Sequence, residues 1–157
     1  MRLIIISDTH HDINAMRKIL PIIDSCDYLV HLGDCNDDIQ RLGVSLKTKV
    51  ICVRGNCDFV NKNPIIQTIT IGETKCLLTH GHALRVKDTL LDLALCAKEN
   101  QCEYAFYGHT HIAGEDEAYG VKMINPGSLG SPKFDRPSYL IVEEEKGKIF
   151  TNILFLP

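Results

Sequence analysis

The chain alternates short apolar runs with polar clusters, and the spacing of its apolar residues predicts most of the secondary structure. In the first half, three runs of β-forming residues are typical of strands that are covered on both faces. Between the first two runs, apolar residues recur at helical spacing, and Asp12 is a suitable N-cap for that helix. This order of elements predicts a largely parallel α/β half. The expected strands are 3–6, 28–32 and 50–53, and the expected helices are 13–23 and 37–42.

The second half is richer in hairpins. Gly72, Gly120 and Gly147 each lie between two apolar runs, as expected of tight turns between antiparallel strands. We therefore expect a mixed α/β fold in which two sheets pack together with helices outside, forming a single domain over residues 1–157. The expected hairpins are 65–71 with 75–79, 112–118 with 121–124, and 138–143 with 148–155; a helix is expected at 84–99, a strand at 104–107 and a loop at 125–128.

The composition narrows the choice of function. Of the 157 residues, 45% are hydrophobic and 24% are charged, and the net charge is −3, as in many soluble globular proteins. No basic stripe runs along any expected element, so no nucleic-acid partner is expected. The seven cysteines are irregularly spaced and form no CxxC pair, which predicts reduced thiols in the cytoplasm. No segment resembles a membrane span or a signal peptide, and the apolar last hairpin either covers the core or forms a homo-oligomer interface.

Five polar clusters each follow a predicted strand. Open α/β folds place their ligands at the carboxyl ends of strands, so we expect the clusters to meet. Gly33 lets the backbone turn sharply before Asp34. Our hypothesis is that Asp34 bridges two metal ions and that the other clusters complete the coordination. The clusters are Asp8-Thr9-His10, His31-Leu32-Gly33-Asp34, Gly55-Asn56-Cys57-Asp58, His80-Gly81-His82 and Gly108-His109-Thr110-His111.

The side chains in these clusters suit a pair of first-row metal ions. Carboxylates, an amide oxygen and imidazoles together favour Mn²⁺, Fe, Co²⁺, Ni²⁺ or Zn²⁺ over Ca²⁺. Asp8 and His10 are two residues apart, as are His109 and His111, and on an extended backbone such residues point to the same side, roughly 6–7 Å apart. Because paired hydrolytic metals lie about 3.5–4 Å apart, one histidine of such a pair is expected to reach each metal. The candidate ligands are Asp8, His10, Asp34, Asn56, His80, His109 and His111.

Taken together, the clusters resemble the signature of the calcineurin-like metallophosphoesterases, and the chain is most similar to the small prokaryotic phosphodiesterases of that superfamily. The resemblance covers residues 3–128. It implies an αββα sandwich and a dinuclear site, with Mn²⁺ as the first candidate metal. It also implies hydrolysis of a small organic phosphodiester by a bridging hydroxide. The matching residues are Asp8-x-His10, Gly33-Asp34, Gly55-Asn56, His80 and Gly108-His109-x-His111.

The resemblance also implies how the ligands divide between the metals. Asp34, Asn56 and His109 are the residues expected to act in catalysis. Two divalent ions and the carboxylates of Asp8 and Asp34 leave a surplus charge of about +2, which suits a hydroxide and a phosphodiester anion together. Asn56 is a neutral ligand and keeps this surplus. The implied first metal is held by Asp8, His10, Asp34 and His111, and the second by Asp34, Asn56, His80 and His109.

Cys57 occupies the position at which many members of the family carry a histidine that protonates the leaving group. A thiol is a poor acid for an alkoxide. His11 or His82 is therefore an alternative proton donor, whereas esters with good leaving groups need none. Three other polar residues near the clusters either orient ligands or have purely structural roles; they are His31, Asp37 and Asp58. The segment 125–128 either places Ser128 or a backbone N–H near the phosphate or is a plain turn.

Three other functions share this chemistry or this fold. A phosphomonoesterase needs added cations near the metals, for which Arg54 and Arg85 are nearest by sequence. A nuclease needs a basic groove, which the sequence lacks. A non-catalytic scaffold similar to the retromer subunit is expected to have lost imidazole ligands, whereas all the candidate ligands remain in this sequence.

Overall fold

A computed structural model describes all 157 residues. None of its helices is both long and apolar enough to cross a membrane. The strands are β1 (Arg2–Ile6), β2 (Tyr28–His31), β3 (Lys49–Cys52), β4 (Ile66–Ile71), β5 (Thr74–Thr79), β6 (Tyr104–Phe106), β7 (Ala113–Ala118), β8 (Val121–Pro126), β9 (Ser138–Glu145) and β10 (Lys148–Phe155). The helices are α1 (Ile13–Lys18), α2 (Leu20–Ile23), α3 (Asp38–Arg41) and α4 (Leu91–Glu99), with a 3₁₀ turn, η1 (His82–Leu84).

The strands form two mixed sheets of five strands each. The first has the order β10-β9-β1-β2-β3, and the second has the order β4-β5-β6-β8-β7. In the first sheet β1, β2 and β3 are parallel, as the alternation of strands and helices predicts, and β9 and β10 pair antiparallel at one side. In the second sheet the central pairs are parallel and both edge pairs are antiparallel hairpins.

The apolar run of β1 is buried on both faces. Leu3 and Ile5 lie in the core between the two sheets, together with Phe106 of β6. Ile4 and Ile6 point to the opposite face, as alternate residues of a strand must, and share a core with helices α1 and α2. A third core joins α4 to the outer face of the second sheet.

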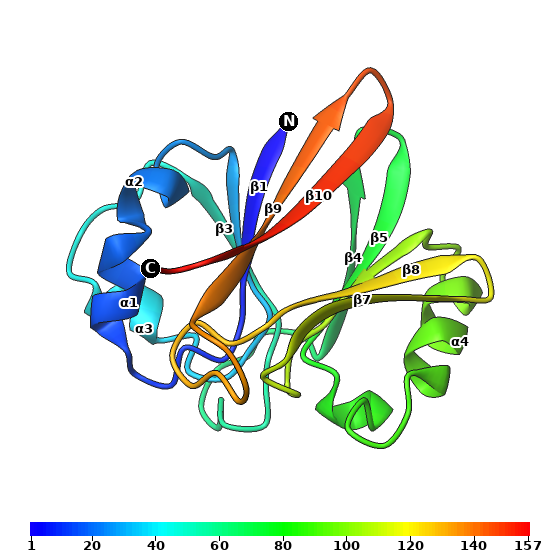
Figure 1. Cartoon of the computed structure of the whole chain (residues 1–157), viewed down its shortest axis with the longest axis horizontal. Helices are drawn as coiled ribbons and strands as arrows, with labels where there is room; N and C mark the ends of the chain where they lie inside the picture. The colour runs from blue at the N-terminus through cyan, green and yellow to red at the C-terminus, as the bar shows by residue number, and fades with distance from the viewer.

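The layers are therefore helix, sheet, sheet and helix. Figure 1 shows α1, α2 and α3 outside the first sheet and α4 outside the second. The prediction of an α/β sandwich of two mixed sheets flanked by helices is confirmed.

The predicted helix 84–99 is wrong in its first half. The turn η1 ends at Arg85, whose left-handed φ of 51° cannot continue a helix, and α4 begins only at Leu91. Val86 is buried against Gly81 without a helical backbone. The apolar residues of this segment thus mark core contacts made by an irregular chain.

The predicted helix 13–23 is two short helices. They meet at Ile19, whose backbone leaves the helical region at φ −96° and ψ 1°. Pro21 follows in the first turn of α2, and proline both lacks an N–H and clashes with the carbonyl four residues earlier. Asp12 caps α1 as predicted, since its side chain accepts a hydrogen bond from the Ala15 backbone N–H at 2.9 Å.

The predicted loop 125–128 begins as part of strand β8. Asn125 pairs with Gly114 and Pro126 with Ala113, and the end of a strand tolerates proline. Asn125 is buried, and its side-chain amide donates to the backbone carbonyl of Gly108 at 3.0 Å. The end of β8 therefore holds the loop that carries the last polar cluster.

Loops from both sheets meet at one end of the sandwich, at the lower edge of Figure 1. The Asp8 backbone N–H donates to the Gly33 carbonyl at 3.0 Å, which joins the loops after β1 and β2. The Gly108 N–H donates to the His80 carbonyl at 3.1 Å, which joins the loops after β5 and β6. The polar clusters that follow these strands are brought together here.

Candidate metal centre

Asp8 lies at the centre of this loop cluster and is fully buried. Its Oδ2 atom accepts hydrogen bonds from the Ser7 hydroxyl at 2.6 Å and from the His109 backbone N–H at 3.0 Å. Its Oδ1 atom instead lies 3.1 Å from Nε2 of His80 and 3.1 Å from Nε2 of His111. One oxygen is thus held by the chain, and the other faces imidazole rings.

Asp34 follows the same division. Its Oδ1 atom accepts a hydrogen bond from the Cys57 backbone N–H at 2.8 Å. Its Oδ2 atom lies 3.6 Å from Nε2 of His80 and 3.8 Å from Nε2 of His10. The two buried carboxylates therefore turn one oxygen each toward a shared group of histidines.

The orientation of His111 tests whether these residues fit a metal ion. Its Nδ1 atom lies 2.6 Å from the carbonyl oxygen of Ser131, to which it can only donate. In the neutral ring Nε2 therefore carries a lone pair, and that atom lies 3.2 Å from Nε2 of His10 and 3.1 Å from Oδ1 of Asp8. Nitrogen and carboxylate atoms that converge in this way fit a cation between them, and a carbonyl partner on the other nitrogen is typical of histidine ligands. The residues present fit a metal.

The histidines separate into two groups. The rings of His10 and His111 lie 4.9 Å apart, centroid to centroid, while the ring of His109 lies 4.8 Å from that of His80. His109 and His111 thus point into different groups although only Thr110 separates them. The compact sets of side chains that could hold an ion include Asp8 with His10 and His111, and Asp8 with Asp34 and His80.

The extended backbone expected for the two-residue pairs is wrong. Asp8 and His10 have φ angles of 54° and 41°, and His109 and His111 have φ angles of 67° and 61°. All four lie in the left-handed region, which costs energy in non-glycine residues and persists mainly where the surrounding structure enforces it. The loop conformation, rather than strand alternation, therefore sets the direction of these side chains. Left-handed residues at the site are Asp8, His10, His11, Asp34, Cys35, His109 and His111.

Gly33 is required for the close approach of two of these loops. Its φ is +109°, and a Cβ atom there would lie 2.6 Å from the Gly55 backbone nitrogen. A side chain at this position would push the loop that carries Asn56 away from Asp34. The sharp turn predicted before Asp34 is present, and it also provides space for a neighbouring backbone.

Asn56 lies in the loop after β3, beside Cys57. The residue is exposed, and its amide Nδ2 lies 3.5 Å from Sγ of Cys57. Its neighbour Cys57 donates directly to Asp34, so the loop position is adjacent to the site although the Asn56 amide faces outward.

Asp58 organises the loops around the site. Its Oδ2 atom accepts the backbone N–H groups of Asp34 at 2.9 Å and Gly55 at 2.8 Å, and its Oδ1 atom accepts that of Asn36 at 2.9 Å. Of the two roles left open by the sequence, orienting the ligand loops is the one seen. Asp37 instead forms an exposed ion pair with Arg41 at 2.9 Å.

Sequence reasoning missed Asp38, which is fully buried. Its Oδ2 atom accepts the Thr9 hydroxyl at 2.6 Å and the His11 backbone N–H at 2.8 Å. His31 completes this network, since its Nδ1 accepts the Gly33 N–H at 3.1 Å and its Nε2 lies 3.2 Å from the Thr9 hydroxyl. The local sequence held no signal that separates Asp38 from its exposed neighbour Asp37, because both lie at the start of the same short helix.

The remaining polar residues contact the site from outside. His11 forms an ion pair with Asp38 at 2.8 Å, and His82 lies 3.2 Å from Nδ1 of His80. Ser128 donates its hydroxyl to the Asp8 backbone carbonyl at 2.8 Å. These contacts orient loops and rings of the candidate centre.

The pKa values of Asp8 and His109 are lowered at this site, and that of Cys57 is raised. Burial acts to raise the pKa of Asp8, but hydrogen bonds with three surrounding histidines outweigh burial and hold this pKa well below its usual value. Burial, followed by the nearby His80, lowers the pKa of His109 to about 4. Asp8 is therefore an anion and His109 a neutral ring at pH 7, which are the forms that bind metals. Burial raises the pKa of Cys57 to about 11.

The sequence matches the calcineurin-like phosphoesterase superfamily domain over residues 1–147. The chain belongs to this superfamily. Probable metallophosphoesterase YsnB of Bacillus subtilis (strain 168) is 35% identical over 147 residues, which are 92% of this chain and 85% of YsnB. Membership confirms the predicted family and the expectation of a metal-dependent phosphoric ester hydrolase.

Solved structures share the fold. An archaeal phosphodiesterase superimposes with a TM-score of 0.76 at 25% identity, covering 98% of this chain and 100% of that one. A Vps29 variant from Entamoeba histolytica superimposes with a TM-score of 0.79 at 20% identity, covering 100% of both chains. The likeness to Vps29 concerns the fold alone.

Proposed function

We propose that this protein is a phosphodiesterase that hydrolyses small organic phosphodiesters with two divalent metal ions. Mn²⁺ is the first candidate, and Ni²⁺, Co²⁺, Fe and Zn²⁺ suit the same donors. The first ion is assigned to Asp8, His10, Asp34 and His111, and the second to Asp34, Asn56, His80 and His109. We treat residues 1–157 as one domain, because a shared core lies between the two sheets.

The divergence of His109 and His111 is the observation that carries this proposal. His111 joins His10 beside Asp8, whereas His109 joins His80. Asp34 turns its Oδ2 atom toward both groups, to His10 and to His80. Two clusters of imidazoles with a carboxylate between them support two ions rather than one.

When bound, two such ions supply a nucleophile from water near neutral pH and stabilise charge on the phosphoryl oxygens. The chain's own residues set the charge of the site. Asp8 and Asp34 offset two of four positive charges, so the site stays cationic toward a phosphodiester. His109 is neutral and Asn56 is uncharged, and neither reduces this surplus. The role of Asn56 requires its side chain to turn inward from its position beside Cys57.

A phosphodiester is proposed over a phosphomonoester because a similar solved structure is that of an archaeal phosphodiesterase, and because one of the two candidate arginines is already paired. Recognition of a terminal dianionic phosphate calls for further arginine or lysine side chains. Arg85 is exposed and paired with Asp88, at 3.2 Å from both Nε and NH2 of the guanidinium. That pairing engages the Arg85 guanidinium.

The scaffold alternative draws on the likeness in fold to Vps29. The retained imidazoles, whose ring nitrogens surround two buried carboxylates, favour hydrolysis. We also propose that the protein works in the cytoplasm, since all seven cysteines are free thiols. Homo-oligomer formation through the last hairpin stays a prediction.

The test is hydrolysis of bis(4-nitrophenyl) phosphate and of 4-nitrophenyl phosphate by metal-stripped protein to which Mn²⁺ is restored. We expect metal-dependent turnover of the diester, reduced more than about a hundred-fold in His109→Ala. Glu143→Gln, which alters only an exposed ion pair with Arg2, is the control and should keep full activity. A preference for the monoester would make the protein a phosphatase, and no turnover with any first-row metal would favour the scaffold.

A further inference from the structure

A hollow of about 700 Å³ opens beside the candidate metal centre. Its walls come from α3, from β3 and from the loop 53–65, which carries Asn56. Cys57 lines the hollow, and its backbone N–H is the group that donates to Asp34. The hollow and the metal centre therefore share a wall. Apolar side chains line much of the hollow: Cys35, Ile39, Val50, Cys57, Phe59 and Val60.

Phe59 and Val60 are the most exposed large apolar side chains of the protein, at 88% and 94%. Exposed apolar surface of this kind contributes nothing to folding, because stabilisation comes from its removal from water. Both residues line the same hollow. Apolar surface presented beside a site, rather than scattered singly, marks a place where a ligand binds.

The loop holds this apolar pair in place. The adjacent Asp58 carboxylate accepts three backbone N–H groups, including that of Asp34. At the base of the loop the Arg54 N–H donates to the Pro64 carbonyl at 2.8 Å. The backbone on both sides of Phe59 and Val60 is therefore tied to the loops of the site.

The charged groups that line the hollow already have partners, and for Asp58 these are three backbone N–H groups. Arg41 lies 2.9 Å from the carboxylate of Asp37, and both line the hollow. His11, also on the wall, is paired with Asp38 at 2.8 Å. An occupant that carried its own charge would have to break one of these pairs, so the lining favours an uncharged group.

We propose that this hollow binds an uncharged planar aromatic group of the substrate, an aryl or heteroaryl ester of the phosphodiester, with Phe59 as a specificity-determining residue. The inference rests on the proposed phosphodiesterase function and names its substrate class. The phosphoryl group lies at the metal centre, and its aromatic substituent packs against Phe59 and Val60. Offset or edge contacts between aromatic rings make Phe59 the main contributor.

The experiment compares two inert diesters, diphenyl phosphate and dimethyl phosphate, which differ only in their substituents. Their dissociation constants for Zn²⁺-loaded protein are measured by calorimetry. We expect wild type to bind diphenyl phosphate about ten-fold more tightly, the gain from burying roughly one face of a ring. In Phe59→Ala most of this preference should vanish, while affinity for dimethyl phosphate stays unchanged.

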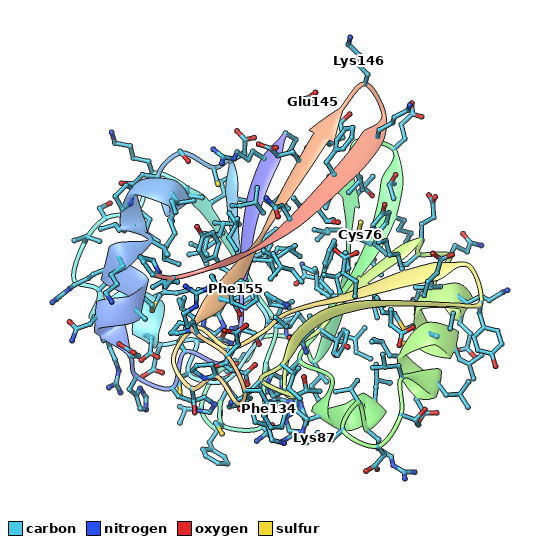
Figure 2. All side chains as sticks on the ribbon, in the orientation of Figure 1. Cys76, Lys87, Phe134, Glu145, Lys146 and Phe155 are labelled. Atoms are coloured by element: carbon cyan, nitrogen blue, oxygen red, sulfur yellow. The ribbon has the colours of Figure 1, made fainter.

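Two other exposed phenylalanines provide matched controls. Phe134 lies at the lower edge of Figure 2, where the site loops gather, and lines a different hollow that includes His111. Phe150 lies on β10, and neither residue lines the proposed hollow. Phe134→Ala and Phe150→Ala should keep the preference, and its loss in all three variants would overturn the assignment to Phe59.

A second measurement locates the ligand without relying on affinity. Methyl NMR signals of Val60 and Ile39 should shift with diphenyl phosphate and stay unchanged with dimethyl phosphate. Equal affinities for the two diesters, or shifts elsewhere only, would overturn the inference even if activated diesters are hydrolysed. Binding in the hollow by a protein that hydrolyses no diester would instead overturn the proposed function and leave the binding site standing.

Discussion

Four buried aspartates surround the loop cluster, and they differ in what their oxygens face. In the outer pair, Asp58 accepts three backbone N–H groups and Asp38 accepts a hydroxyl, a backbone N–H and a ring nitrogen. In the inner pair, Asp8 and Asp34 each give only one oxygen to the chain and turn the other toward imidazole rings.

This contrast separates the carboxylates that the chain itself satisfies from the two proposed as metal ligands. A buried carboxylate that the chain itself satisfies gains stability from those bonds and needs no ion. A buried carboxylate oxygen that faces the lone pairs of histidines is satisfied only by protons or by a cation. Asp8 and Asp34 therefore contribute less to stability and leave one oxygen each able to bind a cation. The bonds of Asp38 and Asp58 hold the loops that carry these two residues.

The largest expected effect is that of Asp34→Asn. The amide keeps the shape and an acceptor for the Cys57 N–H, but it removes the charge between the two histidine groups. We expect diester hydrolysis to fall more than about a hundred-fold and bound metal, measured by elemental analysis, to fall with it. The metal-free variant should unfold at the same urea concentration as metal-free wild type. Unchanged metal content would contradict the bridging role.

Asp58→Asn should act mainly on stability. Its amide NH₂ would face backbone N–H donors in place of an acceptor, so we expect a loss of about 2–3 kcal/mol in the free energy of unfolding by urea. Activity should fall roughly ten- to hundred-fold, as for other residues that orient ligands. Asp37→Asn is the matched control, and its effect should stay within about 0.5 kcal/mol. Equal losses of unfolding free energy in the two variants would show that Asp58 does not hold the loops more firmly than an exposed aspartate does.

The pH dependence of stability should depend on His31. Complete burial lowers its pKa to about 4, while in the unfolded chain the pKa is about 6.5. Below pH 6.5 only the unfolded chain takes up the proton, so stability is lost as the pH falls from 6.5 to 4, by up to about 3 kcal/mol. The difference between wild type and His31→Gln, both metal-free, should shrink over that range. A difference that stays constant would argue against a buried neutral ring.

The smallest effect is expected at Asp12, a carboxylate that satisfies a single N–H. Asp12→Ala removes the N-cap bond to Ala15 and should cost about 1 kcal/mol in unfolding free energy. Metal content and activity should not change. A clear loss of activity in a variant that is still fully folded under the assay conditions would show that the site extends to the start of α1.

The sequence by itself determined the layers and the residue types of the site. Apolar runs such as that of β1 predict strands buried on both faces, because burial requires an apolar residue at every position. It did not predict the breaks at Ile19 and Arg85, since a helical spacing of apolar residues also arises where an irregular chain touches a core.

Only the tertiary structure decided which of the candidate side chains lie together and what orients them. The left-handed backbone of His109 and His111 is imposed by contacts with distant loops, among them the bond from the His109 N–H to Asp8. The burial of Asp38 and the three bonds of Asp58 likewise join residues far apart along the chain. Local sequence carries the chemistry of such groups, but their direction depends on neighbours that only the folded chain supplies.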